Sequence, residues 1–250
     1  MWQYRELIKN LTIAEFKNRY QNTSLGFFWS ILSPLLLSGI LYFVFRNLFR
    51  SEENFAANLL VGIVAWRFFT ISTNSSLLSI VGKPSLVTKV YIPRQILVLS
   101  SIFSALISAF LEFLVLIPIL FILLKSLPVT LPLFLVVHFF YFWLVYGVGL
   151  LLSALFVYFR DLNQIWEVLL NILFFACPII YPLSIVPAYL MPYYMLNPIT
   201  GLITIYRGVM VSGNLPSLNY FAVVIGFAAI AFLVGSYAFD KLQRRFAEAI

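Results

Sequence analysis

The segment Gly82–Arg94, with the sequence GKPSLVTKVYIPR, separates two long apolar runs of the chain. Its basic side chains cannot lie cheaply in lipid, and its prolines bound a stretch of only about two helical turns. The basic residues are Lys83, Lys89 and Arg94, and the prolines are Pro84 and Pro93. We therefore expect a loop at the membrane surface that carries a small helix and is held by a partner. The alternative is an ordinary basic loop that only fixes the orientation of the chain in the membrane.

Hydrophobic residues make up 62% of the chain and charged residues only 10%, whereas a soluble domain has about 25% charged residues. The composition therefore predicts a protein embedded in a membrane. The formal net charge of +7 is spread among the apolar runs. It favours topology signals and contacts with membrane lipids over a nucleic-acid partner. The single cysteine, Cys177, cannot form a disulfide within the chain.

About six apolar runs are long enough to cross the ~30 Å of hydrocarbon in a bilayer. They are Phe27–Phe49, Ala57–Val81, Ile96–Leu124, Val129–Phe159, Gln164–Tyr181 and Tyr220–Phe239. We expect one all-α membrane domain over residues 1–250, with a six-span bundle at 27–239. Before the first run, residues 1–20 show the apolar spacing of one helical face, at Tyr4, Leu7, Ile8, Leu11 and Ala14. This pattern predicts an amphipathic helix in the membrane interface, or one packed against a partner.

Basic residues are distributed unevenly between the two sides of the predicted bundle. With the amino terminus inside, the inner segments contain Arg5, Lys9, Lys17, Arg19, Lys83, Lys89, Arg94, Arg160, Lys241, Arg244 and Arg245. The outer segments contain only Arg46, Arg50, Lys125 and Arg207. The bias predicts a multi-pass protein of the inner (cytoplasmic) membrane with both termini in the cytoplasm.

A second inner turn, Arg160–Gln164, joins the fourth and fifth apolar runs. Asp161 and Gln164 have the spacing of a capping box, so we expect Asp161 to cap the fifth helix.

The outer segment Pro182–Asn219 is apolar but is interrupted by Pro182, Pro187, Pro192 and Pro198, which exclude a long helix. We expect short helices that dip into the outer leaflet or cover an opening, because irregular backbone at that depth must be buried in protein or line a wet cavity. The alternative is a surface hairpin in the headgroup layer.

The sequence offers little for an intramembrane enzyme. His138 is the only histidine, and no HExxH or CxxC pattern occurs, so a metal site or a paired-carboxylate site is not easily assembled. His138 is expected to hydrogen-bond within the bundle. Arg67 and Glu112 are ionisable residues at comparable depths inside the predicted spans, about 15–18 Å from the outer ends. They could form a pair, or each could meet water or backbone separately.

Aromatic residues make up 18% of the chain. An aromatic ring can stack on the C–H face of a sugar without demanding one pattern of hydroxyl groups, so a path lined by such rings would let a glycan slide. The candidates near span ends and along the fifth run include Trp29, Trp166, Phe174 and Phe175. The alternative is an aromatic belt that faces lipid.

Several short motifs occur in order along nearly the whole chain. They are Leu25-Gly26-x-x-Trp29 with Pro34-Leu35, Leu60-x-Gly62-x-x-x-Trp66, Lys89-x-Tyr91-x-Pro93-Arg94, Arg160-Asp161-Leu162, Pro178-Ile179-Ile180-Tyr181, and Asn197-Pro198 with Arg207. In this combination the chain resembles the membrane subunits of ABC-2 transporters, and most closely the exporters of O-antigen, capsule and wall teichoic acid. The compact chain favours O-antigen. A drug or lipid exporter of the same family and a membrane-embedded glycan enzyme are the alternatives.

The resemblance implies a homodimer of six-span subunits that binds two copies of a cytoplasmic ATPase subunit and exports an undecaprenyl-linked glycan. ATP and magnesium would be held by that partner, so this chain is expected to be a channel-forming subunit with no catalytic residue, cofactor or metal of its own. The implied coupling segments are 82–94 and 160–164, with Lys83, Pro84, Leu86, Val87, Lys89, Tyr91, Arg94, Arg160 and Asp161. The resemblance also implies short gate helices before the last span, in the gate region 182–219. The proline-broken segment lies at the outer mouth of the expected channel, so we expect the gate to be formed by Tyr181, Pro182, Pro187, Tyr193 and Tyr194.

Overall fold

The computed structural model describes residues 2–21, 25–26, 28–49, 53–215 and 217–246. Met1, Phe27 and Arg50, which the sequence assigned to the interface helix, the first span and the outer basic residues, lie outside this part. The described chain is helical and contains no strand. Its α-helices are α1 Arg5–Tyr20, α2 Phe28–Phe45, α3 Phe55–Leu78, α4 Pro84–Lys89, α5 Gln95–Leu124, α6 Phe134–Tyr158, α7 Leu162–Ala176, α8 Met191–Leu196, α9 Pro198–Arg207 and α10 Leu218–Leu242. Single turns of other helix types are η1 Trp2–Tyr4, η2 Leu131–Leu133, η3 Leu183–Ile185, η4 Gly208–Ser212 and η5 Gln243–Arg245.

Five described helices are long and apolar enough to cross a membrane, namely α2, α3, α5, α6 together with η2, and α10 together with η5. The predicted fifth span, Gln164–Tyr181, is shorter than expected, because α7 has 15 residues and is only about 22 Å long. It ends at Ala176 since the next residue, Cys177, precedes a proline and adopts an extended backbone. The six predicted spans are therefore five full-length helices and one shorter apolar helix.

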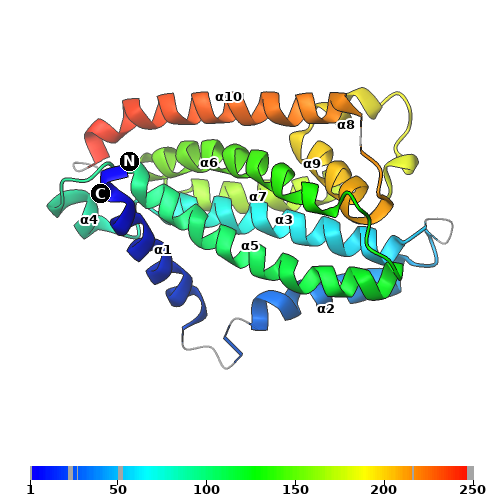
Figure 1. Ribbon diagram of the computed structural model, residues 1–250. Coiled ribbons are helices and arrows are strands. Elements are labelled where there is room, and N and C mark those ends of the chain that lie inside the picture. The colour runs from blue at the N-terminus through cyan, green and yellow to red at the C-terminus, as the bar shows by residue number, and fades with distance from the viewer. Residues whose placement is uncertain (1, 22–24, 27, 50–52, 216, 247–250) are drawn as a thin grey trace.

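Helix α3 forms the core of the bundle, with α2, α5, α6 and α9 packed around it (Figure 1). In its most apolar stretch of 18 residues, 72% of the residues are buried inside the protein. Leu59, Val61 and Ile63 have no exposed surface. A helix that is apolar on all sides is expected in such a central position.

The last helix, α10, lies along α6 for most of its length (Figure 1). The two backbones approach closely at a pair of glycines, since a Cβ atom added to Gly235 would lie 2.1 Å from the carbonyl oxygen of Gly147. Small residues permit this kind of close approach between membrane helices.

Both termini and α4 lie at one end of the bundle, and α8 and α9 lie at the other (Figure 1). We call the first the basic end, defined by segments 82–94, 160–164 and 241–246. The opposite end, called here the far end, carries the end of α2, the start of α3, the α5–α6 connection and the segment 182–215. Helix α1 starts at the basic end and runs obliquely against α5.

Candidate functional site

The loop at the basic end contains the small helix that the prolines predict. Pro84 occupies the first turn of α4, where its missing N–H group costs nothing. Val87 points inward and is only 5% exposed, whereas the side chain of Tyr91, after the helix, is fully exposed at 101%. Lys89 is also exposed. The loop therefore divides into an inner anchor and an outer surface, and Tyr91 is its most prominent feature.

Two ties hold this loop against the bundle. The Lys83 ammonium contacts the Glu15 carboxylate of α1, and Ser101 Oγ of α5 donates to the same carboxylate at 2.9 Å. Burial lowers the pKa of Lys83 to about 8, while the adjoining carboxylate favours the charged form. Arg94 donates to the backbone oxygen of Gln243 after α10.

A cavity of about 490 Å³ lies beside this loop. Its lining residues are Tyr4, Val87, Thr88, Lys89, Val90, Tyr91, Ile92, Pro93, Arg94 and Gln243. This volume lies within the range of ligand-sized clefts.

The second inner turn is exposed at Arg160 and Asp161. Asp161 occupies the position before α7, but its side chain makes no capping hydrogen bond, so the predicted cap is wrong. The reason is local: Asp161 has a helical backbone (φ −70°, ψ −13°), whereas a capping side chain needs an extended one to reach back to the helix.

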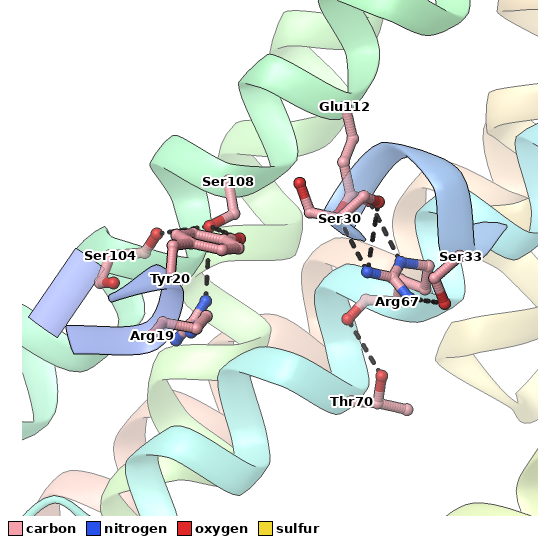
Figure 2. A network of polar contacts seen from close by, with 9 residues as sticks. All are labelled: Arg19, Tyr20, Ser30, Ser33, Arg67, Thr70, Ser104, Ser108 and Glu112. Carbon is pink, nitrogen blue, oxygen red and sulfur yellow. Dashed lines mark hydrogen bonds and ion pairs between the residues drawn. The ribbon is translucent and has the colours of Figure 1, made fainter. Parts of the chain in front are cut away.

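Arg67 of α3 and Glu112 of α5 meet inside the bundle (Figure 2). Arg67 Nη2 donates to Glu112 Oε1 at 3.2 Å and Nε donates to Oε2 at 3.4 Å. Arg67 also donates to Ser33 Oγ at 3.1 Å and to the backbone oxygen of Ser30 at 3.4 Å, both on α2. One guanidinium thus joins three helices, and the Glu112 side chain is only 3% exposed.

The four candidate channel aromatics do not converge in one chain. Trp166 donates its ring N–H to Thr73 Oγ1 of α3 at 3.1 Å, and Phe174 packs on Trp66 with ring centroids 5.9 Å apart. Trp29 and Phe175 instead face outward. A shared path would have to form between copies of the chain, so the channel role of these residues stays a prediction.

Sequence reasoning did not single out the outward face of α7. Leu170 is its one buried residue, and its exposed apolar side chains are Ile165, Val168, Leu169, Ile172 and Phe175. Their spacing of three and four residues was a readable signal of a one-sided helix. The prediction of a full membrane span over Gln164–Tyr181 does not distinguish this one-sided pattern from an apolar helix that faces lipid on all sides.

The segment 182–215 at the far end contains short helices, as its prolines predict. Helix α9 is capped by Asn197, whose side-chain oxygen accepts from the Ile199 N–H at 3.0 Å. The helix is buried against α3 and α10, which favours a segment that dips into the protein over a hairpin in the headgroup layer.

Two tyrosines of the predicted gate are joined. The Tyr181 hydroxyl donates to the backbone oxygen of Phe175 at 3.0 Å. The Tyr194 hydroxyl lies 3.0 Å from the Tyr181 hydroxyl. Pro182 is buried, whereas Pro187 and Tyr193 are exposed. That this segment closes a path stays a prediction.

Arg207 ties the segment 182–215 to the core, a contact that the sequence alone does not indicate. It donates to the backbone oxygens of Asn58 on α3 at 3.0 Å and of Ile179 after α7 at 2.7 Å. Gly62 makes room for it, since a Cβ atom there would lie 3.2 Å from Arg207 Nη2.

His138 is buried, and its Nδ1 lies 2.5 Å from the Tyr206 hydroxyl, which confirms the predicted hydrogen bond within the bundle. Among the described residues no group of three or more His, Cys, Asp and Glu side chains could hold a metal ion.

Comparison with known proteins gives a consistent result. Residues 6–211 match the family described as ABC-2 type transporter. The chain is 30% identical over 257 residues to the O-antigen export system permease protein RfbA of Myxococcus xanthus, covering 100% of this chain and 97% of that protein. It is 28% identical over 254 residues to the protein of the same name from Klebsiella pneumoniae, covering 98% and 95%. The polysialic acid transport protein KpsM of Escherichia coli is 25% identical over 243 residues, covering 91% and 90%.

Proposed function

Since the chain belongs to the ABC-2 type transporter family, we propose that it is the membrane-spanning permease of a polysaccharide exporter, with a lipid-linked O-antigen as the leading substrate. The observation that carries the proposal is the end-to-end similarity to permeases named for O-antigen export. The bundle of long apolar helices agrees with a transport role.

The energy source is a separate ATPase subunit that holds ATP and magnesium. The basic end supports this assignment, because the exposed Tyr91 and the adjacent cavity of about 490 Å³ offer an anchor and a cleft. Positive residues gather on the cytoplasmic side of membrane proteins, so the basic end and both termini face the cytoplasm of the inner membrane. The outward apolar faces of α2 and α7 support a homodimer, with two ATPase subunits beneath it.

Export can be tested in cells that lack the chain. Removing the permease should abolish surface O-antigen while lipid-linked glycan accumulates on the cytoplasmic side, and returning the wild-type chain should restore the surface signal. Surface glycan at the wild-type level without the chain would overturn the proposed substrate.

Partner binding can be tested separately with two exposed tyrosines at opposite ends. Tyr91→Ala should reduce the ATPase subunit that co-purifies with the chain by about tenfold or more, because exposed tyrosines are frequent anchors worth about 2 kcal/mol. Tyr189→Ala is the matched control, since Tyr189 is 74% exposed but lies at the far end. Equal retention of the ATPase by both variants would remove the basic end as the docking surface.

A further inference from the structure

A row of polar side chains runs along α5 inside an otherwise apolar bundle. Ser101, Ser104, Ser108 and Glu112 are buried, and their spacing of three and four residues places them on one face of the helix. Helix α1 lies against this row. Arg19 of α1 donates to Ser108 Oγ at 3.4 Å and to Ser75 Oγ of α3 at 2.9 Å.

The charges along this row do not balance. Glu15 contacts Lys83 and Glu112 pairs with Arg67. Arg19 has no carboxylate within ion-pair distance among the described residues, and its hydrogen bonds to Ser75 and Ser108 are to neutral hydroxyls. Burial lowers the pKa of Arg19, but a guanidinium keeps its proton in proteins. The row therefore has one more cation than it has carboxylates, because Glu112, which also attracts Arg19 from a distance, is already paired with Arg67.

The Ser108 hydroxyl lies beside this cation, and the side chains of Tyr20 and Ser104 lie near Ser108 (Figure 2). The Tyr20 hydroxyl lies 3.0 Å from Ser108 Oγ. Ser104, one turn away on α5, has no exposed surface, and its Oγ has no hydrogen-bond partner in the described structure. Buried polar atoms are seldom left unpartnered without a reason. An arginine with several hydroxyl donors is the chemistry that recognises phosphate oxygens.

We propose that Arg19, with the hydroxyls of Tyr20, Ser104 and Ser108, binds the phosphate ester group of a lipid. Helix α1 is a surface helix that starts at the basic end, where lipid headgroups lie, and Arg19, near the other end of this helix, is partly exposed. A phosphate on Arg19 would supply the missing negative charge. It could come from a phospholipid of the bilayer or from the diphosphate of a polyprenyl-linked glycan, and only the second source rests on the proposed function.

The test uses the full chain in nanodiscs and measures bound lipid by native mass spectrometry. The probes are phosphatidylglycerol, undecaprenyl diphosphate and the uncharged undecaprenol. Arg19→Gln should lower retention of a phosphate-bearing lipid about tenfold, the equivalent of losing about 1.4 kcal/mol, and should leave undecaprenol unchanged. Arg19→Lys should restore most of the retention. Lys17→Gln is the control, because it removes the same charge from an exposed position of the same helix.

The probe that Arg19→Gln releases identifies the source of the phosphate. Loss of undecaprenyl diphosphate alone assigns the site to the glycan carrier, and loss of phosphatidylglycerol alone assigns it to the bilayer. Ser104→Ala gives a second variant that keeps the charge, and it should weaken retention by a smaller factor without lowering the Tm. If Arg19→Gln and Lys17→Gln retain both phosphate-bearing lipids equally, the site does not exist. That result would leave the export function untouched, since export is measured in cells.

Discussion

The pair formed by Arg67 and Glu112 allows a quantitative test of the fold. Its two N–O distances of 3.2 and 3.4 Å exceed the ~2.7–2.9 Å of the strongest charged hydrogen bonds. We therefore place the cost of breaking it at the low end of the range for buried pairs, at about 3 kcal/mol for Arg67→Ala and for Glu112→Ala. After Glu112→Ala, Arg67 keeps only its neutral contacts with Ser33 and Ser30. After Arg67→Ala, the buried carboxyl group loses its cation.

The double variant should cost at least about 2 kcal/mol less than the sum of the two single losses, because it leaves no unpaired charge behind. Such a coupling clearly exceeds the average of about 0.6 kcal/mol for neutral hydrogen bonds between membrane helices. Reversible unfolding of the purified chain in mixed micelles measures the stability of the wild type, of each single variant and of the double variant. Ser33→Ala is the control and should cost about 0.6 kcal/mol. Losses that add within about 0.5 kcal/mol would mean that the two charges do not interact.

Three further outcomes follow from local geometry. Val87→Asp should lower the Tm of the isolated chain, since it buries an unpaired charge at the loop's inner anchor. An unchanged Tm would contradict the burial of Val87. Gly235→Ala should lower the free energy of unfolding by about 1–3 kcal/mol through overpacking against Gly147. Gly226→Ala is the control and should be neutral or slightly stabilising, because nothing lies within 4 Å of the new atom. Equal melting curves for the two variants would exclude the close approach of the helices. Asn197→Ala should cost about 1 kcal/mol by removing the cap of α9, and Asn197→Asp should retain most of it; a loss with both variants would show that the cap is not the cause.

The sequence predicts the long helices well because a membrane span must be a continuous apolar run. The prediction of Ile96–Leu124 for the third span is confirmed within one residue by α5, Gln95–Leu124. Hydropathy marks only the part of a helix that lies within the hydrocarbon layer, so it misses helical turns beyond that layer. The last span was expected to end at Phe239, but α10 continues to Leu242, with polar side chains at its end.

The contacts of the site are harder to predict, because most join residues far apart in the chain. The sequence presented Arg67 and Glu112 as two buried charges that could pair, and only their positions on adjacent helices decided the matter. The sequence places Lys83 in a loop at the membrane surface, and the structure shows that its ammonium contacts Glu15, 68 residues earlier. No local pattern contains such a partner.

Helix α1 carries contacts of two kinds, and this has a mechanical consequence. Glu15 contacts the loop at Lys83, and Arg19, one turn later on the same helix, contacts the polar row at Ser108. A helix segment of this length is stiff compared with a loop. If a partner displaces the loop, either the contact at Glu15 breaks or α1 follows and shifts Arg19 along the row. The loop and the proposed phosphate site are therefore coupled through one helix, and Glu15→Gln should weaken the effect of partner binding on lipid retention while Arg19 itself is intact. Unchanged coupling in that variant would show that α1 does not transmit the displacement.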